Sequence, residues 1–161
     1  DVLGGKDNLT DVNAAIGLQQ LKQLPAYQTR RSALARQYFD AIRAEIKSTS
    51  LDLQIELPVE NFTESNWHMF QVVLPLDQLN CDRAQIMTEL KDQGIGTGVH
   101  YPAITGFTLY KELGYQSSNT PIAERVGRSI LTLPLFPGMA DADIGRIARE
   151  LVQILKKHHK N

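Results

Sequence analysis

The 161 residues of this chain match the usual size of one domain, and they are enough to bury a hydrophobic core without disulfide bonds. With 17 basic and 18 acidic side chains, the formal net charge of −1 excludes the broad positive field that draws proteins to nucleic acid or to anionic membranes. The single cysteine, Cys81, excludes an internal disulfide and a multi-thiolate zinc site, and it is typical of a reducing compartment.

The apolar runs of the sequence are short. The longest, such as MFQVVLPL, fall well below the length that crosses a bilayer, and no basic-then-apolar leader pattern begins the chain. We therefore expect a cytoplasmic protein that has no membrane partner. The chain opens at Asp1 without a methionine and runs almost at once into organised sequence, so we expect a piece of a longer protein.

The sequence of residues 1–48 predicts two helices that precede a compact unit. Asn8 or Thr10 can cap a first helix, which Pro25 interrupts. A second, longer helix follows, with an apolar stripe at helical spacing formed by Tyr27, Leu34, Tyr38, Ala41, Ile42 and Ile46. These two helices are longer than a small sheet can cover. We therefore expect this helical arm, residues 1–48, to pack on a protein surface outside this chain.

Residues 49–161 predict a compact α+β domain with a small, mostly antiparallel sheet. Strict alternation over 51–57, then the runs 67–76 and 95–101, predict three strands. Helices are expected from Asn80 or Asp82 to Lys91, over a short stretch at 106–114, from Pro121 onward, and from a cap at Asp141 to the C-terminal end. Prolines 134 and 137 keep the segment between the last two helices extended.

The stretch DQGIGTGVHYP, residues 92–102, contains three glycines followed by a histidine and a tyrosine. A dinucleotide-binding loop needs a strand before its glycines and a helix after them, and here a helix comes first and a proline follows, which excludes that function. We expect Gly94 to end the helix, and Gly96 and Gly98 to leave one face of a strand bare for a close approach. His100 and Tyr101 then stand at the end of that strand, where loops carry functional side chains.

Other candidate groups favour structural roles. Cys81 lacks the neighbouring base and acid of a nucleophilic triad, and the double arginine at 30–31 is explained by a solvated helix face at least as well as by phosphate binding. Trp67 and His68 open a strand and are expected to be mainly structural. Taken one at a time, these motifs assign no catalytic residue and no metal ligand.

Five blocks of sequence are more informative in combination than any single motif. In chain order they are NLTDVNAAIGLQQLKQL, RRSALARQYFDAI, WHMFQVVLP, LKDQGIGTGVHYP and LTLPLFPGM. They resemble the C-terminal part of the DegT/StrS family of pyridoxal-phosphate-dependent nucleotide-sugar aminotransferases. The resemblance implies a type I, aspartate aminotransferase-like fold, of which this chain is the small C-terminal domain (49–161) and the linking helices from the large domain (1–48). It also implies a homodimer in which the helical arm packs on the large domain and the partner.

The resemblance assigns site residues one by one. Asn8 takes the position at which family members reach the cofactor phosphate of the neighbouring subunit. His100 and Tyr101 match the family's histidine–tyrosine pair at the mouth of the sugar-nucleotide site, where a ring nitrogen and a phenolic hydroxyl can bind sugar or phosphate oxygens. No lysine of the chain has the context of the family's Schiff-base lysine. The resemblance therefore implies pyridoxal 5'-phosphate in the full-length enzyme, with none bound to this fragment alone.

The function implied is transfer of an amino group from an amino acid, with glutamate as the expected donor, to a nucleotide-linked keto sugar in amino-sugar or polysaccharide biosynthesis. Two alternatives stay open. Some relatives are sugar dehydratases in which histidine replaces the lysine, a residue that lies outside this chain. The chain can also be a stand-alone, non-catalytic domain for dimerisation or ligand binding.

Overall fold

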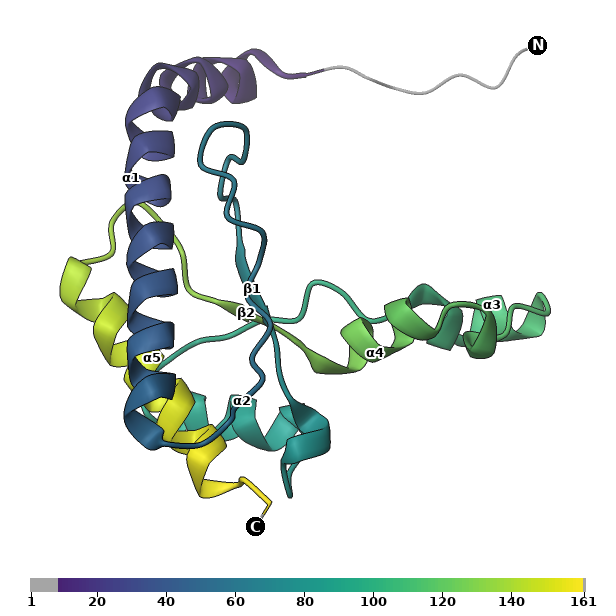
Figure 1. Cartoon of the computed structure of the whole chain (residues 1–161). Coiled ribbons are helices and arrows are strands. Elements are labelled where there is room, and N and C mark those ends of the chain that lie inside the picture. The colour runs from purple at the N-terminus through teal and green to yellow at the C-terminus, as the bar shows by residue number, and fades with distance from the viewer. Residues whose placement is uncertain (1–8, 161) are drawn as a thin grey trace.

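A computed structural model describes residues 9–160 of the chain. Within them it contains helices α1 (Asp11–Thr49), α2 (Arg83–Asp92), α3 (Thr108–Glu112), α4 (Pro121–Ser129) and α5 (Asp141–Lys157), and strands β1 (Phe70–Val73) and β2 (Ile130–Leu133). Figure 1 shows the later part of α1 beside α5, with the two strands next to them, while α3 and α4 project away from this body. Among these residues no helix has the length and apolar character needed to span a membrane.

Helix α1 is a single helix of 39 residues, so the predicted break at Pro25 is wrong. Pro25 lacks the N–H that would bond to the preceding turn, but its ring is tolerated where a helix can bend, and Figure 1 shows a sharp bend in the first part of α1. The helix begins at the predicted alternative Thr10, whose Oγ1 accepts a hydrogen bond from Asn13 N–H at 3.3 Å.

The hydrophobic core forms where the second half of α1 meets α5 and the strands. The stripe expected on α1 is buried at its centre, and Tyr38 donates from its hydroxyl to Pro134 O at 2.7 Å. Aromatic rings extend the contact toward β1: Tyr38 stacks on Phe70 with centroids 4.7 Å apart. The fully buried side chains with the largest volumes are Tyr38, Phe39, Phe70, Leu34, Ile42, Ile86, Leu90, Ile95, Leu131, Leu133, Ile144 and Leu151.

The regular sheet is one antiparallel pair, β1–β2, in the register Phe70↔Leu133 to Val73↔Ile130. Two further segments flank it through single antiparallel bridges, Glu56↔Val73 and Gly98↔Thr132. The predicted strands 51–57 and 95–101 are therefore wrong as regular strands, although both lie where strands of a small antiparallel sheet would lie. The predicted alternation survives over 51–57, since its even-numbered residues are exposed and its leucines and isoleucine are at least partly buried.

The helix ends confirm most of the predicted start and stop signals. Asp82 caps α2 by accepting from Gln85 N–H at 2.9 Å, Gly94 follows that helix at φ 71°, and Pro121 begins α4. The predicted cap at Asp141 is wrong, because Asp141 is the first residue of α5. The carboxylate that accepts a hydrogen bond from the Ala140 N–H at this end is that of Asp143, at 3.0 Å.

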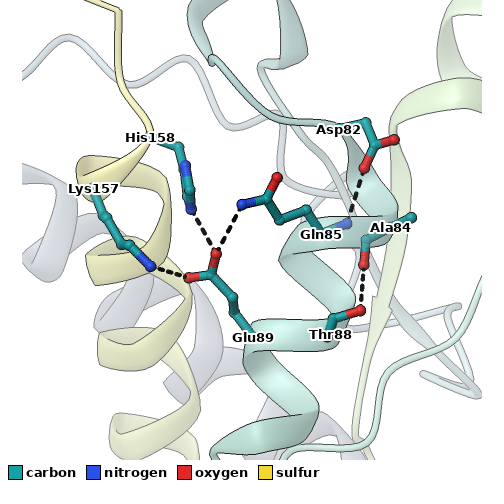
Figure 2. Close-up of polar contacts among 7 residues, drawn as sticks. All are labelled: Asp82, Ala84, Gln85, Thr88, Glu89, Lys157 and His158. Atoms are coloured by element: carbon teal, nitrogen blue, oxygen red, sulfur yellow. Dashed lines mark hydrogen bonds and ion pairs between the residues drawn. The ribbon is translucent and has the colours of Figure 1, made fainter.

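Glu89 joins α2 to the end of α5 (Figure 2). Its carboxylate lies 2.7 Å from His158 Nε2 and 3.0 Å from Lys157 Nζ, and Gln85 Nε2 donates to it at 3.3 Å. Hydrogen bonds from Lys157 and then His158 are the main causes that lower the pKa of Glu89 from 4.5 to about 2. The carboxylate is therefore held in its charged form by the contacts that fix α5 against α2.

The residues after α5 continue this attachment. Asn80 N–H donates to His158 O at 2.8 Å, Lys160 N–H donates to Gln78 O at 2.8 Å, and Leu79 and His159 form an antiparallel bridge. The two histidines near the C-terminal end thus belong to the folded domain.

We expect Glu89→Gln to destabilise the chain by about 1–2 kcal/mol at neutral pH, because a neutral amide makes weaker bonds to Lys157 and His158. A lowered carboxyl pKa adds stability above about 4.5 that is lost as the pH falls toward about 2. Urea unfolding from neutral to acid pH should therefore give a flatter pH dependence for the variant. The control is Glu112→Gln on the exposed surface of α3; equal pH profiles for both variants would contradict the role of Glu89.

Candidate functional site

The candidate site is built on a row of three residues across the sheet. Gly98 and Thr132 exchange both backbone hydrogen bonds, at 3.0 and 2.8 Å. On the other side of β2, Thr132 faces Gln71 of β1 as a pair without backbone bonds between them, the arrangement in which facing side chains lie closest. Directly opposed residues point to the same face of a sheet, so Gln71, Thr132 and the bare position at Gly98 share one face.

His100 folds back over this row. Its ring Nδ1 lies 2.9 Å from Thr132 Oγ1, and its carbonyl oxygen accepts a hydrogen bond from Gln71 Nε2. A Cβ at Gly98 would lie 2.8 Å from His100 Cε1, closer than real Cβ contacts come. The missing side chain at Gly98 is therefore what leaves room for the imidazole, and the expected close approach at this glycine comes from the chain's own His100.

Tyr101 extends the site outward. Its ring centroid lies 5.0 Å from that of His100, in an edge-to-face arrangement with an interplanar angle of 86°, and the peptide bond between the two residues is cis. The side chain of Tyr101 is 70% exposed, whereas His100 is half-buried. The pair offers a held imidazole and an open phenol to a ligand that approaches from solvent.

The loop that follows is attached to α4. The backbone of Gly127 on α4 comes so close that a Cβ there would lie 2.4 Å from Ala103 N. Thr105 Oγ1 donates to the Glu124 carboxylate at 2.5 Å, and hydrogen bonds from Thr105 and Ser117 lower the pKa of Glu124. A hollow of about 220 Å³ lies beside this loop, with Pro102, Ala103, Phe107, Gly127 and Arg128 in its lining.

The other candidates from the sequence have different outcomes. Asn8 lies outside the residues that the structure describes. Arg30 donates to Met139 O and pairs with Asp141 at 2.7 Å, and Arg31 donates to Asn66 O, so both serve internal contacts. Trp67 is buried among aromatic rings and is 3% exposed, consistent with a structural role.

The described residues do not provide a cofactor-holding lysine. Their lysines, at 22, 47, 91, 111, 156, 157 and 160, are all exposed, and Lys157 pairs with Glu89. A Schiff-base lysine is instead expected in a pocket that lowers its pKa. Residues 9–160 also bring together no group of three or more side chains able to hold a metal ion.

The sequence predicted His100 and Tyr101 but missed Gln71 and Thr132. Both missed residues are polar positions within largely apolar strands, FQVV and ILTL. A polar side chain inside an otherwise apolar strand is the one signal that singles them out.

Comparisons with known proteins identify the family of the chain. The model of the DegT/DnrJ/EryC1/StrS aminotransferase family matches residues 1–152. The chain belongs to this family. Its fold matches that of part of the solved sugar aminotransferases.

Three solved structures illustrate the similarity. A putative sugar aminotransferase, Spr1654 from Streptococcus pneumoniae, is 26% identical over 93% of this chain and 36% of its own, with a TM-score of 0.76. DesV of S. venezuelae, solved with a ketimine intermediate, is 27% identical over 92% of this chain and 37% of its own, with a TM-score of 0.75. Helicobacter pylori PseC, an aminotransferase of pseudoaminic acid biosynthesis, shares the fold at 20% identity and a TM-score of 0.81, over 98% of this chain and 40% of its own. The chain therefore spans well under half the length of these proteins.

We expect Gly127→Ala to destabilise this chain by about 1–3 kcal/mol, because the new methyl group would clash with the backbone at Ala103. The matched control is Gly145→Ala, also in a helix, where a Cβ would meet nothing within 4 Å. That change should be neutral or stabilise by about 0.5–1 kcal/mol. Urea unfolding of both variants gives the comparison, and equal stabilities would contradict the close packing of α4 on the loop.

Proposed function

We propose that this chain is the C-terminal part of a pyridoxal-phosphate-dependent sugar aminotransferase. The enzyme moves an amino group from an amino acid, with glutamate as the expected donor, to the carbonyl carbon of a nucleotide-linked keto sugar. The products are the corresponding oxo acid and amino sugar. The observation that carries the proposal is the family match over residues 1–152, and the sugar aminotransferases among the similar structures support it.

The proposed division is into linking helices, 1–48, and a small domain, 49–161. The exposure of the first part of α1 supports a partner there: large apolar side chains of this part are exposed, namely Val12, Ile16, Leu18, Leu21 and Leu24. An apolar helix surface of this kind is typical of an interface. In the proposed enzyme the large domain and a second subunit cover it, while the second half of α1 belongs to the core of the small domain.

The cofactor, pyridoxal 5'-phosphate, supplies an electron-accepting ring when bound. Solved forms of Spr1654 include a PLP-form and a PMP-form. Residues 9–160 do not fit the cofactor by themselves, because their lysines are exposed on the surface. We therefore assign the cofactor's lysine to the part of the enzyme that this chain does not span, with Asn8 as the chain's own proposed contact to the phosphate.

His100 and Tyr101 are the proposed substrate-binding residues. The imidazole is held in place by Thr132, and the exposed phenol lies against it, so together they can bind the oxygen atoms of a sugar or a phosphate. Their role is to orient the nucleotide sugar at the mouth of the site, and the proton transfers of the reaction belong to the cofactor's lysine.

The test of this function uses the protein made from its natural gene. With glutamate and a nucleotide-linked keto sugar, we expect 2-oxoglutarate and an amino sugar in equal amounts, in a reaction that depends on pyridoxal 5'-phosphate. Loss of a hydroxyl group from the sugar without net nitrogen transfer would instead assign a dehydratase, and no reaction with a range of keto sugars would contradict the proposal.

In that enzyme we expect His100→Ala to lower kcat/KM for the nucleotide sugar about 10- to 100-fold, because the proposed hydrogen bond between the imidazole and the substrate is lost. Tyr101→Phe, which removes only the hydroxyl, should have a smaller effect in the same direction. Unfolding curves provide the control. Unchanged kcat/KM together with reduced stability would assign His100 a structural role.

The 161-residue chain alone should not acquire a stoichiometric label on one lysine when it is incubated with pyridoxal 5'-phosphate and reduced with borohydride. Exposed lysines react weakly and without selectivity because their amines stay protonated near neutral pH. Peptide mapping of the reduced chain gives the result, with the natural gene product as the positive control. A single fully labelled lysine within this chain would contradict the assignment of the cofactor's lysine elsewhere.

A further inference from the structure

The contact between Thr132 and His100 can form with either of two placements of the ring proton. Thr132 is 8% exposed, and its Oγ1 lies 2.9 Å from His100 Nδ1. A neutral imidazole has one N–H and one bare nitrogen, so either the threonine hydroxyl donates to a bare Nδ1, or an Nδ1–H donates to the hydroxyl oxygen. The two cases leave Nε2 with opposite properties.

The hydrogen-bond inventory of Thr132 separates the two cases. Within residues 9–160, the contact with Nδ1 is the one hydrogen bond of its hydroxyl group. If Nδ1 carried the proton, the hydroxyl hydrogen would be left without an acceptor in a largely buried position, and the lost hydration of that donor would not be compensated. If the hydroxyl donates, its hydrogen is satisfied and the oxygen is left only with unused lone pairs, a smaller penalty.

The backbone keeps the hydroxyl in place for this role. Thr132 is held on one side by its two bonds to Gly98 and on the other by the β1–β2 pairing, and it is β-branched, so its side chain has few accessible rotamers. Gln71 Nε2 bonds to the His100 carbonyl oxygen, and the bare position at Gly98 admits the ring. The ring orientation and the donor that faces Nδ1 are therefore both fixed by the sheet.

We propose that Thr132 is a positioning residue that holds His100 as the Nε2–H tautomer, so that the site presents an N–H donor to its ligand. The ligand atom opposite Nε2 is then an oxygen acceptor, such as a sugar hydroxyl, a carbonyl or a phosphate oxygen. This inference rests on the proposed function only for the identity of the ligand as a nucleotide sugar. The tautomer itself follows from contacts within the chain.

The direct test is the tautomer of His100, measured by long-range 1H–15N spectra of the chain labelled with 15N-histidine. The chain has four histidines, and the signals of His100 are those lost in His100→Asn. At about pH 8.5, above the usual pKa of imidazole, we expect a bare-nitrogen shift for Nδ1 and a protonated-nitrogen shift for Nε2. The reverse assignment, or an even mixture of tautomers, overturns the proposal.

The kinetic test uses the natural gene product with two variants of Thr132. Thr132→Ser keeps the hydroxyl and should stay within about twofold of the native kcat/KM for the nucleotide sugar. Thr132→Val keeps the branched shape but removes the donor, and it should lose about tenfold, mainly through a higher KM. Equal losses in both variants, or none in Thr132→Val while His100→Ala is impaired, overturn the role of Thr132.

The two proposals fail in different ways. If His100→Ala leaves the kinetics unchanged, the substrate role of His100 is wrong, and the spectra still decide whether Thr132 sets the tautomer. If His100→Ala impairs turnover but the spectra give a protonated Nδ1, the substrate role stands and the tautomer inference is wrong.

Discussion

The packing of the second half of α1 against α5 is the interaction on which the rest of the structure depends. Leu34, Tyr38 and Ile42 recur at helical spacing and are all fully buried, and each such side chain contributes about 1.5–3 kcal/mol by leaving water. The same helix reaches the sheet, since Tyr38 stacks on Phe70 and donates to Pro134 O just after β2. Burial raises the pKa of the Tyr38 phenol, so it stays a neutral donor in this contact.

This packing explains how so small a sheet can support a site. Two strands of four residues would be marginal alone, but β2 is covered by the core, with Leu131 and Leu133 buried. Thr132 lies between these leucines and therefore points to the opposite face. The rigidity that the core gives to β2 is thus passed to the one hydroxyl that contacts His100, whereas the loop beyond Tyr101 depends on separate contacts with α4.

Local signals in the sequence were sufficient for the elements whose ends are determined by nearby residues. Asp82, Gly94 and Pro121 all occupy the helix ends that their chemistry predicts. The predicted break at Pro25 was wrong because a proline removes only one backbone hydrogen bond from a helix. An exposed, bent helix tolerates that loss when its helical turns continue on both sides of the proline. A strand, unlike a helix, needs a partner, and the pairing of 51–57 and 95–101 stops after single bridges that no local pattern encodes.

The same distinction explains what could be predicted of the candidate site. His100 and Tyr101 stand out because they follow a run of glycines, but Thr132 and Gln71 become neighbours of His100 only through the strand register. The glycines before the histidine predicted a bare strand face that another group approaches closely. At Gly98 the space is filled by the imidazole of His100, so the missing side chain lets the ring reach the Thr132 hydroxyl. A glycine two residues before a histidine, with a threonine opposite it on the paired strand, therefore holds the imidazole in place. The glycine provides the space for the ring, and the strand pairing places the threonine hydroxyl against it.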